Sequence, residues 1–562
     1  MRHLYRLALL AAVFPAAAGA QSPLPRKHKP QPTKPEITAA DLMTRLYIFS
    51  DDSMLGREAG TLGNVKGTNY IAAEAKRMGL IPAGDNGTYF QTIPLKTRVF
   101  DTTSTFTVGG APLAAYTDYV LNGRVAIENP ALAVVYGGDI GDSAHAISPE
   151  QAAGKLVVFG ARAGIIGRRV RVPPTPGAAA IALIALDSLP PRFMNFFRSP
   201  QTFVDDVPAA APAPKPSFLI TNVAAARMFA KPLDSLTAGD AGNPAALNIR
   251  VTVAPVADPA RNVVGIVRGS DPKLAGEYVA IGGHNDHLGV GRIAFDHDSI
   301  KIWNHVVRPE GADDGGKQAS PAQQATVDSL LADFRKTHPG ADRPDSIYNG
   351  ADDDGSGSVS VLEVAERIAS LRVKPKRSVL FVWHVGEEKG LLGSRFFTDH
   401  PTVPRDSIVA QLNMDMVGRG DATDETGRTK DGTPLHGSPT YLQLVGSRRL
   451  STELGDLVEQ VNTADHHNLT LDYALDADGH PSNIYCRSDH YEYARYGIPI
   501  VFFTTGLHSD YHQVTDEPEY IDYNHMAKVV NLVEDIAIHV ANLDHRVVVD
   551  KPKPDPNGAC RQ

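Results

Sequence analysis

The segment YVAIGGHNDHLG (residues 278–289) decides the fold, because an apolar run of strand length ends in two glycines and a group of polar side chains. Nearly continuous apolar strands of this kind are typical of a sheet that is buried on both faces. Later segments repeat the pattern, in the order SVLFVWHVGEE (378–388), IVAQLNMDM (408–416) and IPIVFFTTGLHSDYH (498–512). A further apolar run at 262–267 precedes them. We therefore predict buried strands that each end in polar residues.

Helical periodicity alternates with these strands. Apolar residues recur at helical spacing in the segments 40–48, 67–78, 358–371, 451–461 and 524–543. Alternation of strands and helices indicates a largely parallel sheet with helices packed on its faces. The predicted fold class is therefore α/β, with a mixed, mostly parallel sheet sandwiched by helices.

The polar residues after these strands form the candidate site. In open α/β sheets, ligands bind beyond the carboxyl ends of the strands. Each strand delivers a histidine or a carboxylate to the same edge of the sheet, and these residues are His284, Asp286, Glu387, Glu388, Asp415 and His512. This repeated pattern is the main functional signal in the sequence.

Their side chains suit a pair of divalent metal ions. Zinc in proteins takes nitrogen and oxygen ligands, and a catalytic zinc keeps one position open for water or substrate. Two such ions are usually bridged by a carboxylate. The turn NGADDDGSG (349–357) precedes a predicted helix and offers Asp352, Asp353 or Asp354 as the bridge. Of the adjacent Glu387 and Glu388, one can bind metal while the other takes a proton from water. Asp286 is placed to accept the free ring N–H of His284.

The ordered set of motifs resembles the zinc exopeptidase family typified by the bacterial secreted aminopeptidases and the yeast vacuolar aminopeptidase Y. The matching segments are 52–79 with Leu55-Gly56-Arg57, 262–265, 283–289, 350–357, 386–393, 413–419 and 509–512. The resemblance implies the zinc exopeptidase fold and two Zn²⁺ ions per chain. One ion would be held by His284, Asp353 and Asp415. The other would be held by Asp353, Glu388 and His512, so that Asp353 bridges the pair.

The resemblance also implies roles for three other features. Glu387 matches the general base of the family, and a cis peptide bond is implied between Asp353 and Asp354. Tyr511 matches a tyrosine that stabilises the oxyanion in some members. The expected activity is an aminopeptidase that hydrolyses the N-terminal peptide bond of peptides or proteins.

The chain has 562 residues, which is too long for one ordinary core. We expect a discontinuous peptidase domain from segments 38–95 and 257–545, followed by a tail at 546–562. Short β-rich runs separated by turn residues fill 96–256, and this insert resembles a protease-associated domain. A second, polar insertion at 291–346 carries one predicted helix at 321–334. Its GADDGG sequence (311–316) is an imperfect copy of the bridging motif, and we do not expect it to bind metal.

The N-terminus predicts export. Residues 1–20 have the charged start, apolar stretch and small-residue end of a signal peptide, which leaves Gln21 as the new N-terminus. Residues 21–37 are rich in proline and lysine and predict a flexible leader. The two cysteines, Cys486 and Cys560, could form a disulfide after export, and the sequence leaves this open.

Composition excludes some classes of partner. A net charge of −9 argues against a nucleic-acid partner, because phosphate binding needs a basic surface. No apolar run long enough to span a membrane follows residue 20. The sequence does not predict the oligomeric state.

Two alternative functions stay open. A carboxypeptidase or dipeptidase on the same scaffold would need a cation for the substrate carboxylate, and the sequence offers Arg419, Arg487 and Arg495 without placing them. A non-catalytic binding protein would normally have lost ligands or the base. The full ligand set also argues against a single-metal glutaminyl cyclase.

Four polar residues near the motifs have undecided roles. His287 is expected in a solvated loop, and His508 either contacts the pocket or braces its loop. Ser488 and Asp489 either cap a helix or line the substrate pocket.

Overall fold

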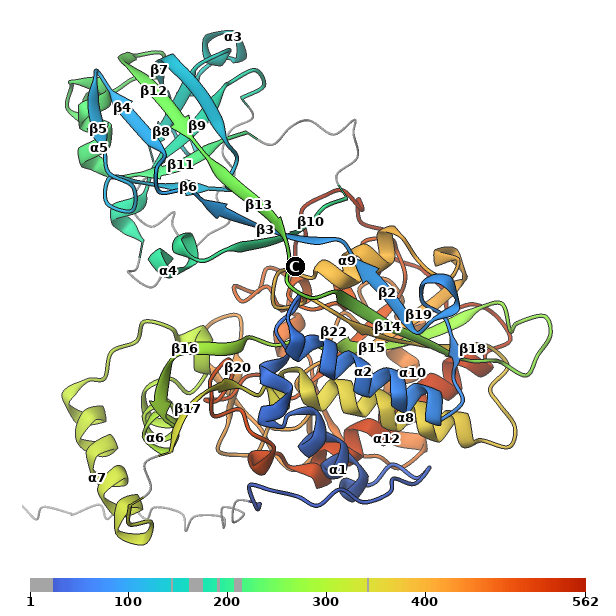
Figure 1. The fold of residues 1–562 in the computed structure, drawn as a ribbon. Coiled ribbons are helices and arrows are strands. Elements are labelled where there is room, and N and C mark those ends of the chain that lie inside the picture. The colour runs from blue at the N-terminus through green and yellow to red at the C-terminus, as the bar shows by residue number, and fades with distance from the viewer. Residues whose placement is uncertain (1–23, 143–144, 161–174, 190–192, 207–214, 341–342) are drawn as a thin grey trace, which may run out of the picture.

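The structure is a computed structural model that describes residues 24–142, 145–160, 175–189, 193–206, 215–340 and 343–562. The predicted signal peptide and its cleavage point lie outside these residues. The described chain folds around two separate sheets, one of nine strands and one of eight. Figure 1 shows the two bodies joined by a narrow connection at β3, β10 and β13.

The nine-stranded sheet is the centre of the larger body. Its order is β1-β14-β18-β15-β19-β24-β22-β23, with β2 also paired to β14. The bounds are β1 (Ile81–Pro82), β2 (Phe90–Ile93), β14 (Ala260–Val267), β15 (Tyr278–His284), β18 (Ser378–His384), β19 (Ile408–Met414), β22 (Tyr441–Val445), β23 (Thr470–Asp472) and β24 (Ile500–Thr504).

Strand direction in this sheet differs between its centre and its edges. The four central strands, β18, β15, β19 and β24, run parallel to one another. Strand β14 is antiparallel to β18, and β22 is antiparallel to β24. The α/β fold is confirmed, while "mostly parallel" describes the centre of the sheet and not its margins. The parallel centre is the part that brings four strand ends to one edge.

Helices cover both faces of this sheet. They are α1 (Ala39–Phe49), α2 (Leu62–Arg77), α8 (Gly357–Ser370), α9 (Leu392–Asp399), α10 (Thr452–Ala464), α11 (His490–Ala494) and α12 (Tyr523–Asn542). Alternate residues of β18 enter different cores, as strand geometry requires. Phe381 and Trp383 pack with α1, α2, α8, α10 and α12, whereas Leu380 and Val382 pack with α9 and α11. Among the described helices, none is long and apolar enough to cross a membrane.

The smaller body is built from the β-rich segment. Its eight-stranded sheet contains β4 (Thr105–Val108), β5 (Ala111–Leu113), β6 (Tyr119–Asn122), β7 (Ile127–Asp139), β8 (Leu156–Gly160), β9 (Ala180–Ile184), β11 (Ser217–Ile220) and β12 (Ala241–Ile249). Three short helices accompany it: α3 (Pro149–Ala152), α4 (Phe193–Arg198) and α5 (Asn222–Phe229). A three-stranded sheet of β10 (Gln201–Val204), β3 (Leu95–Phe100) and β13 (Val251–Pro255) joins it to the larger body. The identity of this body as a protease-associated domain stays a prediction.

The polar insertion forms an outgrowth of the larger body (Figure 1). It consists of β16 (Gly289–Asp296), α6 (His297–Val307), α7 (Pro321–Thr337) and β17 (Pro344–Tyr348), and β16 pairs with β17. The predicted helix at 321–334 corresponds to α7. Ser320 and Gln323 form a capping box at its start, and Pro321 occupies the first turn, where its missing N–H costs nothing. Helix α6 was not predicted from the sequence.

The leader and the tail lie against the larger body. The leader has no helix or strand between Leu24 and Lys34, but Tyr47 donates a hydrogen bond to Pro25 O at 2.6 Å and Thr33 donates one to Glu366 at 2.8 Å. These two hydrogen bonds join the described part of the leader to helix α1 and helix α8, and the flexibility of the leader stays a prediction. In the tail, Cys560 forms a disulfide with Cys486. The sequence left open whether these two cysteines pair, and in the structure they do.

Candidate metal centre and active site

The parallel strands bring their polar ends together at one edge of the central sheet. His284 is the last residue of β15, and Asp415 directly follows β19. Glu387 and Glu388 lie three and four residues beyond β18, and His512 lies in the loop after β24. The edge that the sequence pattern indicated is therefore where these side chains lie.

Asp353 lies between the two histidines. Its Oδ1 is 3.1 Å from His284 Nε2, and its Oδ2 is 2.9 Å from His512 Nε2. Burial alone would raise the pKa of Asp353, but the two histidines beside its carboxylate hold the pKa well below its ordinary value. The peptide bond between Asp353 and Asp354 is cis, as the family resemblance implied.

The neighbouring aspartates hold the backbone around the site. Asp354 accepts hydrogen bonds from the backbone N–H of His284 at 2.8 Å and of Gly357 at 2.9 Å. Asp352 accepts one from the N–H of Gly418 at 2.7 Å. Of these three acidic residues, Asp353 is thus the one whose two oxygens face two different histidines.

His508 also belongs to this scaffold. Its Nε2 lies 3.1 Å from Asp352 Oδ2, and the side chain is fully buried. Of the two roles that the sequence left open, the structure therefore places His508 as a brace of the loop.

His287 is a member of the site that the sequence analysis placed wrongly. Its side chain is fully buried, and its Nδ1 lies 2.7 Å from Glu388 Oε1. Arg57 explains this position. Its side chain donates hydrogen bonds to the backbone carbonyl groups of Asn349 at 2.7 Å and Gly350 at 2.8 Å. Its own backbone carbonyl accepts a hydrogen bond from the N–H of His287. A second histidine three residues after His284 was the sequence signal that could have indicated this site residue. The sequence does not show, however, that a distant arginine folds this loop inward.

Gly350 makes room for the His287 ring. It has a φ of 54°, and a Cβ atom there would lie 2.5 Å from the ring's Cγ. Only glycine fits this position without displacing the ring.

Two groups of these residues could each hold a metal ion. The first contains His284, Asp353 and Asp415, and the second contains His287, Asp353, Glu388 and His512; in each group the ligand atoms lie within 4.8 Å of one another. His284 Nε2, His287 Nδ1 and Glu388 Oε1 are buried without a hydrogen bond of acceptable geometry, although oppositely charged atoms lie close by. This arrangement suits atoms that face a common cation. The mixed nitrogen and oxygen donors fit zinc.

A third group of this type lies where the insertion meets the rest of the larger body. His297, Asp345 and Glu517 also bring their ligand atoms within 4.8 Å. The Arg343 guanidinium lies 3.3 Å from His297 Nδ1 and 3.9 Å from Glu517. A cationic side chain therefore already supplies positive charge to this group, which disfavours a metal ion there.

The Asp286 carboxylate has a different role from the one predicted. His284 Nδ1 contacts the backbone carbonyl of Asp286 at 3.0 Å, so the carboxylate is not its main partner. The carboxylate Oδ1 instead accepts from the backbone N–H of Gly386 at 2.7 Å and of Glu387 at 3.2 Å. Burial raises the pKa of Asp286 to about 7. Asp286 therefore positions the turn that carries Glu387.

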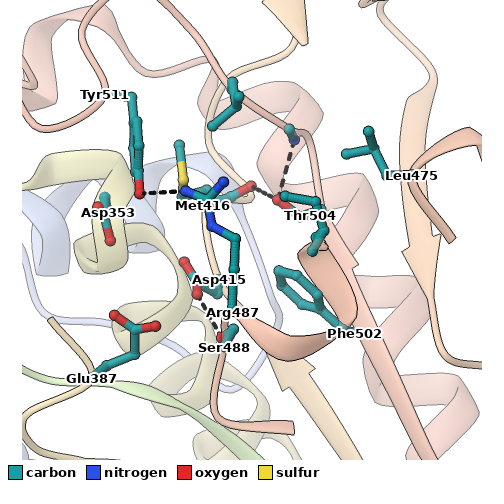
Figure 2. A pocket seen from close by; sticks show the side chains of 13 residues that line it. Asp353, Glu387, Asp415, Met416, Leu475, Arg487, Ser488, Phe502, Thr504 and Tyr511 are labelled. Carbon is teal, nitrogen blue, oxygen red and sulfur yellow. Dashed lines mark hydrogen bonds between the residues drawn. The ribbon is translucent and has the colours of Figure 1, made fainter. Parts of the chain in front are cut away.

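Glu387 lines a pocket beside Asp415 (Figure 2). Burial raises the pKa of Glu387 well above its ordinary value; His284 opposes this shift and the charge of Glu388 adds to it. A carboxylate with a raised pKa is a better proton acceptor and donor near neutral pH than an ordinary glutamate.

Ser488 supports the site directly. Its hydroxyl donates to Asp415 Oδ2 at 2.7 Å and accepts from Asn413 at 3.0 Å. Helix α11 begins at His490, and Asp489 precedes it without a capping hydrogen bond from its side chain. The sequence left open whether Ser488 caps a helix or lines the pocket, and in the structure it lines the pocket. Asp489 lies instead 3.4 Å from His384.

The pocket has an acidic wall and an apolar wall. Figure 2 shows Asp353, Glu387 and Asp415 on one side and Leu475 and Phe502 on the other. The lining residues are Asp353, Glu387, Asp415, Met416, Leu475, Ile484, Arg487, Ser488, Phe502, Thr504, Gly506, Leu507 and Tyr511. Such a pocket can take an apolar side chain on one side and a cationic group on the other.

Tyr511 and Arg487 close the pocket near Asp353. The Tyr511 ring stacks on His512 at 4.0 Å between ring centroids, and Arg487 donates to the Tyr511 hydroxyl at 3.2 Å. Arg487 is also paired with Asp313 of the insertion, at 2.6 Å. The imperfect GADDGG motif thus reaches the pocket, although it joins neither metal group of the site.

Parts of the chain are similar in sequence to known peptidases. The profile of peptidase family M28 matches residues 324–537. The leucine aminopeptidase 1 of Ajellomyces dermatitidis is 29% identical over 205 residues, 35% of this chain and 48% of that protein. The leupeptin-inactivating enzyme 1 of Streptomyces exfoliatus is 33% identical over 109 residues, 18% of this chain and 25% of that protein. The chain spans about half the length of the fungal relative and a quarter of the Streptomyces relative.

The fold likeness extends further along the chain. An aminopeptidase from Aneurinibacillus sp. strain AM-1 superposes with a TM-score of 0.50 at 16% identity. The superposition covers 92% of this chain and 97% of that one. At this identity the likeness shows a shared fold, and it includes the β-rich body as well as the central sheet.

Proposed function

We propose that this protein is an exported di-zinc aminopeptidase, with Glu387 as its general base. The match of residues 324–537 to the profile of peptidase family M28 supports this proposal. It would hydrolyse the first peptide bond of peptides or proteins that have a free N-terminus. The observation that carries the proposal is the position of Asp353, whose two carboxylate oxygens face one histidine each. A carboxylate in that position suits a bridge between two ions.

The proposed ligand sets follow the two groups of side chains. His284, Asp353 and Asp415 would hold one zinc ion, and Asp353, Glu388 and His512 would hold the other. Zinc bound there would polarise the scissile carbonyl and lower the pKa of the attacking water. His287 would orient Glu388 through the contact at its Nδ1.

The chain's own residues would then move the proton. Glu387 lies within the pocket, and it would take a proton from the attacking water and give it to the departing amine. Asp286 would keep Glu387 in place through the backbone N–H groups that it binds. Tyr511 would donate a hydrogen bond to the oxygen on which negative charge develops.

The placement of the arginines favours an aminopeptidase over a carboxypeptidase. Arg419 is paired with Asp424 and Asp510, and Arg495 is paired with Asp399 and Glu492. Arg487 is the single basic side chain among the described residues that line the pocket, and Asp313 pairs with it. The acidic wall suits a substrate ammonium group, whereas no unpaired arginine of this set is available for a carboxylate.

The apolar wall predicts the preferred N-terminal residue. Leu475, Ile484 and Phe502 would surround its side chain. Burying a leucine side chain is worth roughly 1.5–3 kcal/mol. We therefore expect leucine anilide to exceed glutamate anilide in kcat/KM by about 100-fold, and N-acetyl-leucine anilide not to be cleaved. The name of the fungal relatives agrees with this preference.

A substrate panel on zinc-loaded protein tests this proposal. Turnover of free aminoacyl anilides supports it. Turnover of N-blocked dipeptides in their place would favour the carboxypeptidase alternative. Absence of turnover of every substrate, with two zinc ions bound, would favour the non-catalytic binding protein.

Export and the identity of the β-rich body belong to the same proposal. The Cys486–Cys560 disulfide suits an oxidising compartment, where disulfides persist. The β-rich body would be a protease-associated domain, as its composition and place in the chain favour. We expect the exported protein to begin at Gln21, and N-terminal sequencing of the mature chain checks this. A mature chain that retains residues 1–20 would contradict it.

A further inference from the structure

The insertion between β16 and β17 packs directly on the loop that carries His512. Lys301 of α6 forms an ion pair with Asp510 at 2.6 Å, and Asn304 donates to Gln513 at 3.2 Å. The backbone N–H of Ala312 donates to Tyr511 O at 3.0 Å. At Gly311, whose φ is 56°, a Cβ atom would lie 2.6 Å from the same carbonyl oxygen. The contact is thus too close for a larger residue.

This packing brings Asp313 to the wall of the pocket. Its two carboxylate oxygens accept hydrogen bonds from Arg487 at 2.6 and 3.0 Å, which is the paired geometry typical of strong arginine–carboxylate contacts. The same guanidinium donates to the Tyr511 hydroxyl at 3.2 Å. Arg487 lines the pocket, while Asp313 does not, so Asp313 acts on the pocket through Arg487.

The pairing determines the charge that a substrate meets. With Asp313 in place, the positive charge of Arg487 is compensated within hydrogen-bond distance. Without it, the pocket that Arg487 and Asp353 both line would present an uncompensated cation to the substrate. A free carboxylate on the residue after the cleaved bond is the substrate group that such a cation would attract.

We propose that Asp313 is a specificity-determining residue, which neutralises Arg487 so that the site does not favour dipeptides with a free carboxylate. This inference rests on the proposed aminopeptidase function. It assigns a role to the insertion, which adjusts the substrate range from outside the metal site. The site therefore has no charge-based preference for dipeptides over longer peptides, in which the terminal carboxylate lies far from Arg487.

Two substrates that differ in one charge test the inference. Leu-Gly carries a carboxylate next to the scissile bond, and Leu-Gly amide lacks it. The measured quantity is the ratio of two kcat/KM values, that for Leu-Gly divided by that for Leu-Gly amide. Asp313→Asn removes the charge of the side chain and keeps its shape, and we expect it to raise this ratio by about tenfold. Asp313→Glu should restore the ratio of the unmodified protein.

Matched controls separate this effect from a loss of structure. Asp333→Asn removes a charge from the same insertion, at an exposed ion pair with Lys336, and should leave the ratio unchanged. In the double variant Asp313→Asn with Arg487→Gln, the gain should disappear. A purely structural ion pair would instead lower turnover of both substrates equally and leave their ratio unchanged.

The outcomes are distinct from those that test the function itself. A ratio in Asp313→Asn within twofold of the unmodified protein would overturn the inference. If Asp313→Asn does not fold, Arg487→Gln alone tests the inference. That variant leaves the charge of Asp313 uncompensated, so the ratio should fall about tenfold. An unchanged ratio in Arg487→Gln would also overturn the inference. Absence of turnover of leucine anilide by the unmodified zinc-loaded protein would reject the proposed function instead.

Discussion

Replacing Glu387 with glutamine is expected to lower kcat/KM for leucine anilide by about 10³-fold or more, because a glutamine cannot accept the proton of the attacking water. The zinc content should stay at about two ions per chain, since Glu387 belongs to neither metal group. The substitution keeps the side-chain volume at a buried position and removes a carboxylate whose pKa burial raises. Anilide kinetics together with metal analysis by mass spectrometry check both parts of this prediction.

Glu388→Gln provides the contrast. Glu388 lies 3.0 Å from His512 through Oε2 and 2.7 Å from His287 through Oε1, so this neighbour is placed to bind metal. The change there should reduce the zinc content as well as the activity. If Glu387→Gln lost zinc while Glu388→Gln kept it, the two roles would be exchanged. If Glu387→Gln retained full turnover, the site would use another base.

The fold and the position of the site could be predicted because the signals are local. The buried strands β15, β18 and β19 are continuous apolar runs, and each is followed at once by polar residues. The ordinary geometry of parallel strands then brings those residues to one edge. The sequence predicted a mixed sheet but did not place its antiparallel strands, since β14 and β22 are apolar runs with no local mark of direction.

Several contacts of the site depend on segments that lie far apart in the chain. His287 is turned inward by Arg57, more than 200 positions earlier, and the spacing of residues near His287 carries no sign of this. Asp313 meets Arg487 across a sequence separation of 174 residues. The contact of the GADDGG segment with the pocket depends on how the insertion folds back, which its own residues do not indicate.

The role of Asp286 shows a limit of a different kind. Its distance from His284 in sequence suggested a carboxylate–histidine pair, which is a frequent arrangement around zinc. In the structure the backbone carbonyl of Asp286 takes that role, and the carboxylate turns toward Gly386 and Glu387. Spacing alone does not distinguish a backbone oxygen from a side-chain oxygen of the same residue.

Asp353→Ala is expected to have the largest effect on the metal centre. The change removes both oxygens that face His284 and His512, so each ion would lose a ligand and the bridge between them. We expect the zinc content to fall from about two ions per chain to about one or none, and kcat/KM to fall by at least about 10⁴-fold, beyond the range for loss of a general base alone. Metal analysis and anilide kinetics measure these changes.

In the same variant, the thermal stability of the fold should no longer depend on zinc. A ligand that binds only the folded state adds about 4 kcal/mol at roughly 1,000 times its Kd. A chelator should therefore lower the thermal midpoint of the unmodified protein, but have little effect on Asp353→Ala. Asp345→Ala removes a carboxylate from the third His/Asp/Glu group and should keep about two zinc ions, because Arg343 already supplies charge there. If Asp345→Ala lost zinc and Asp353→Ala kept it, the metal centre would lie at the group of His297, Asp345 and Glu517 and not at the edge of the central sheet.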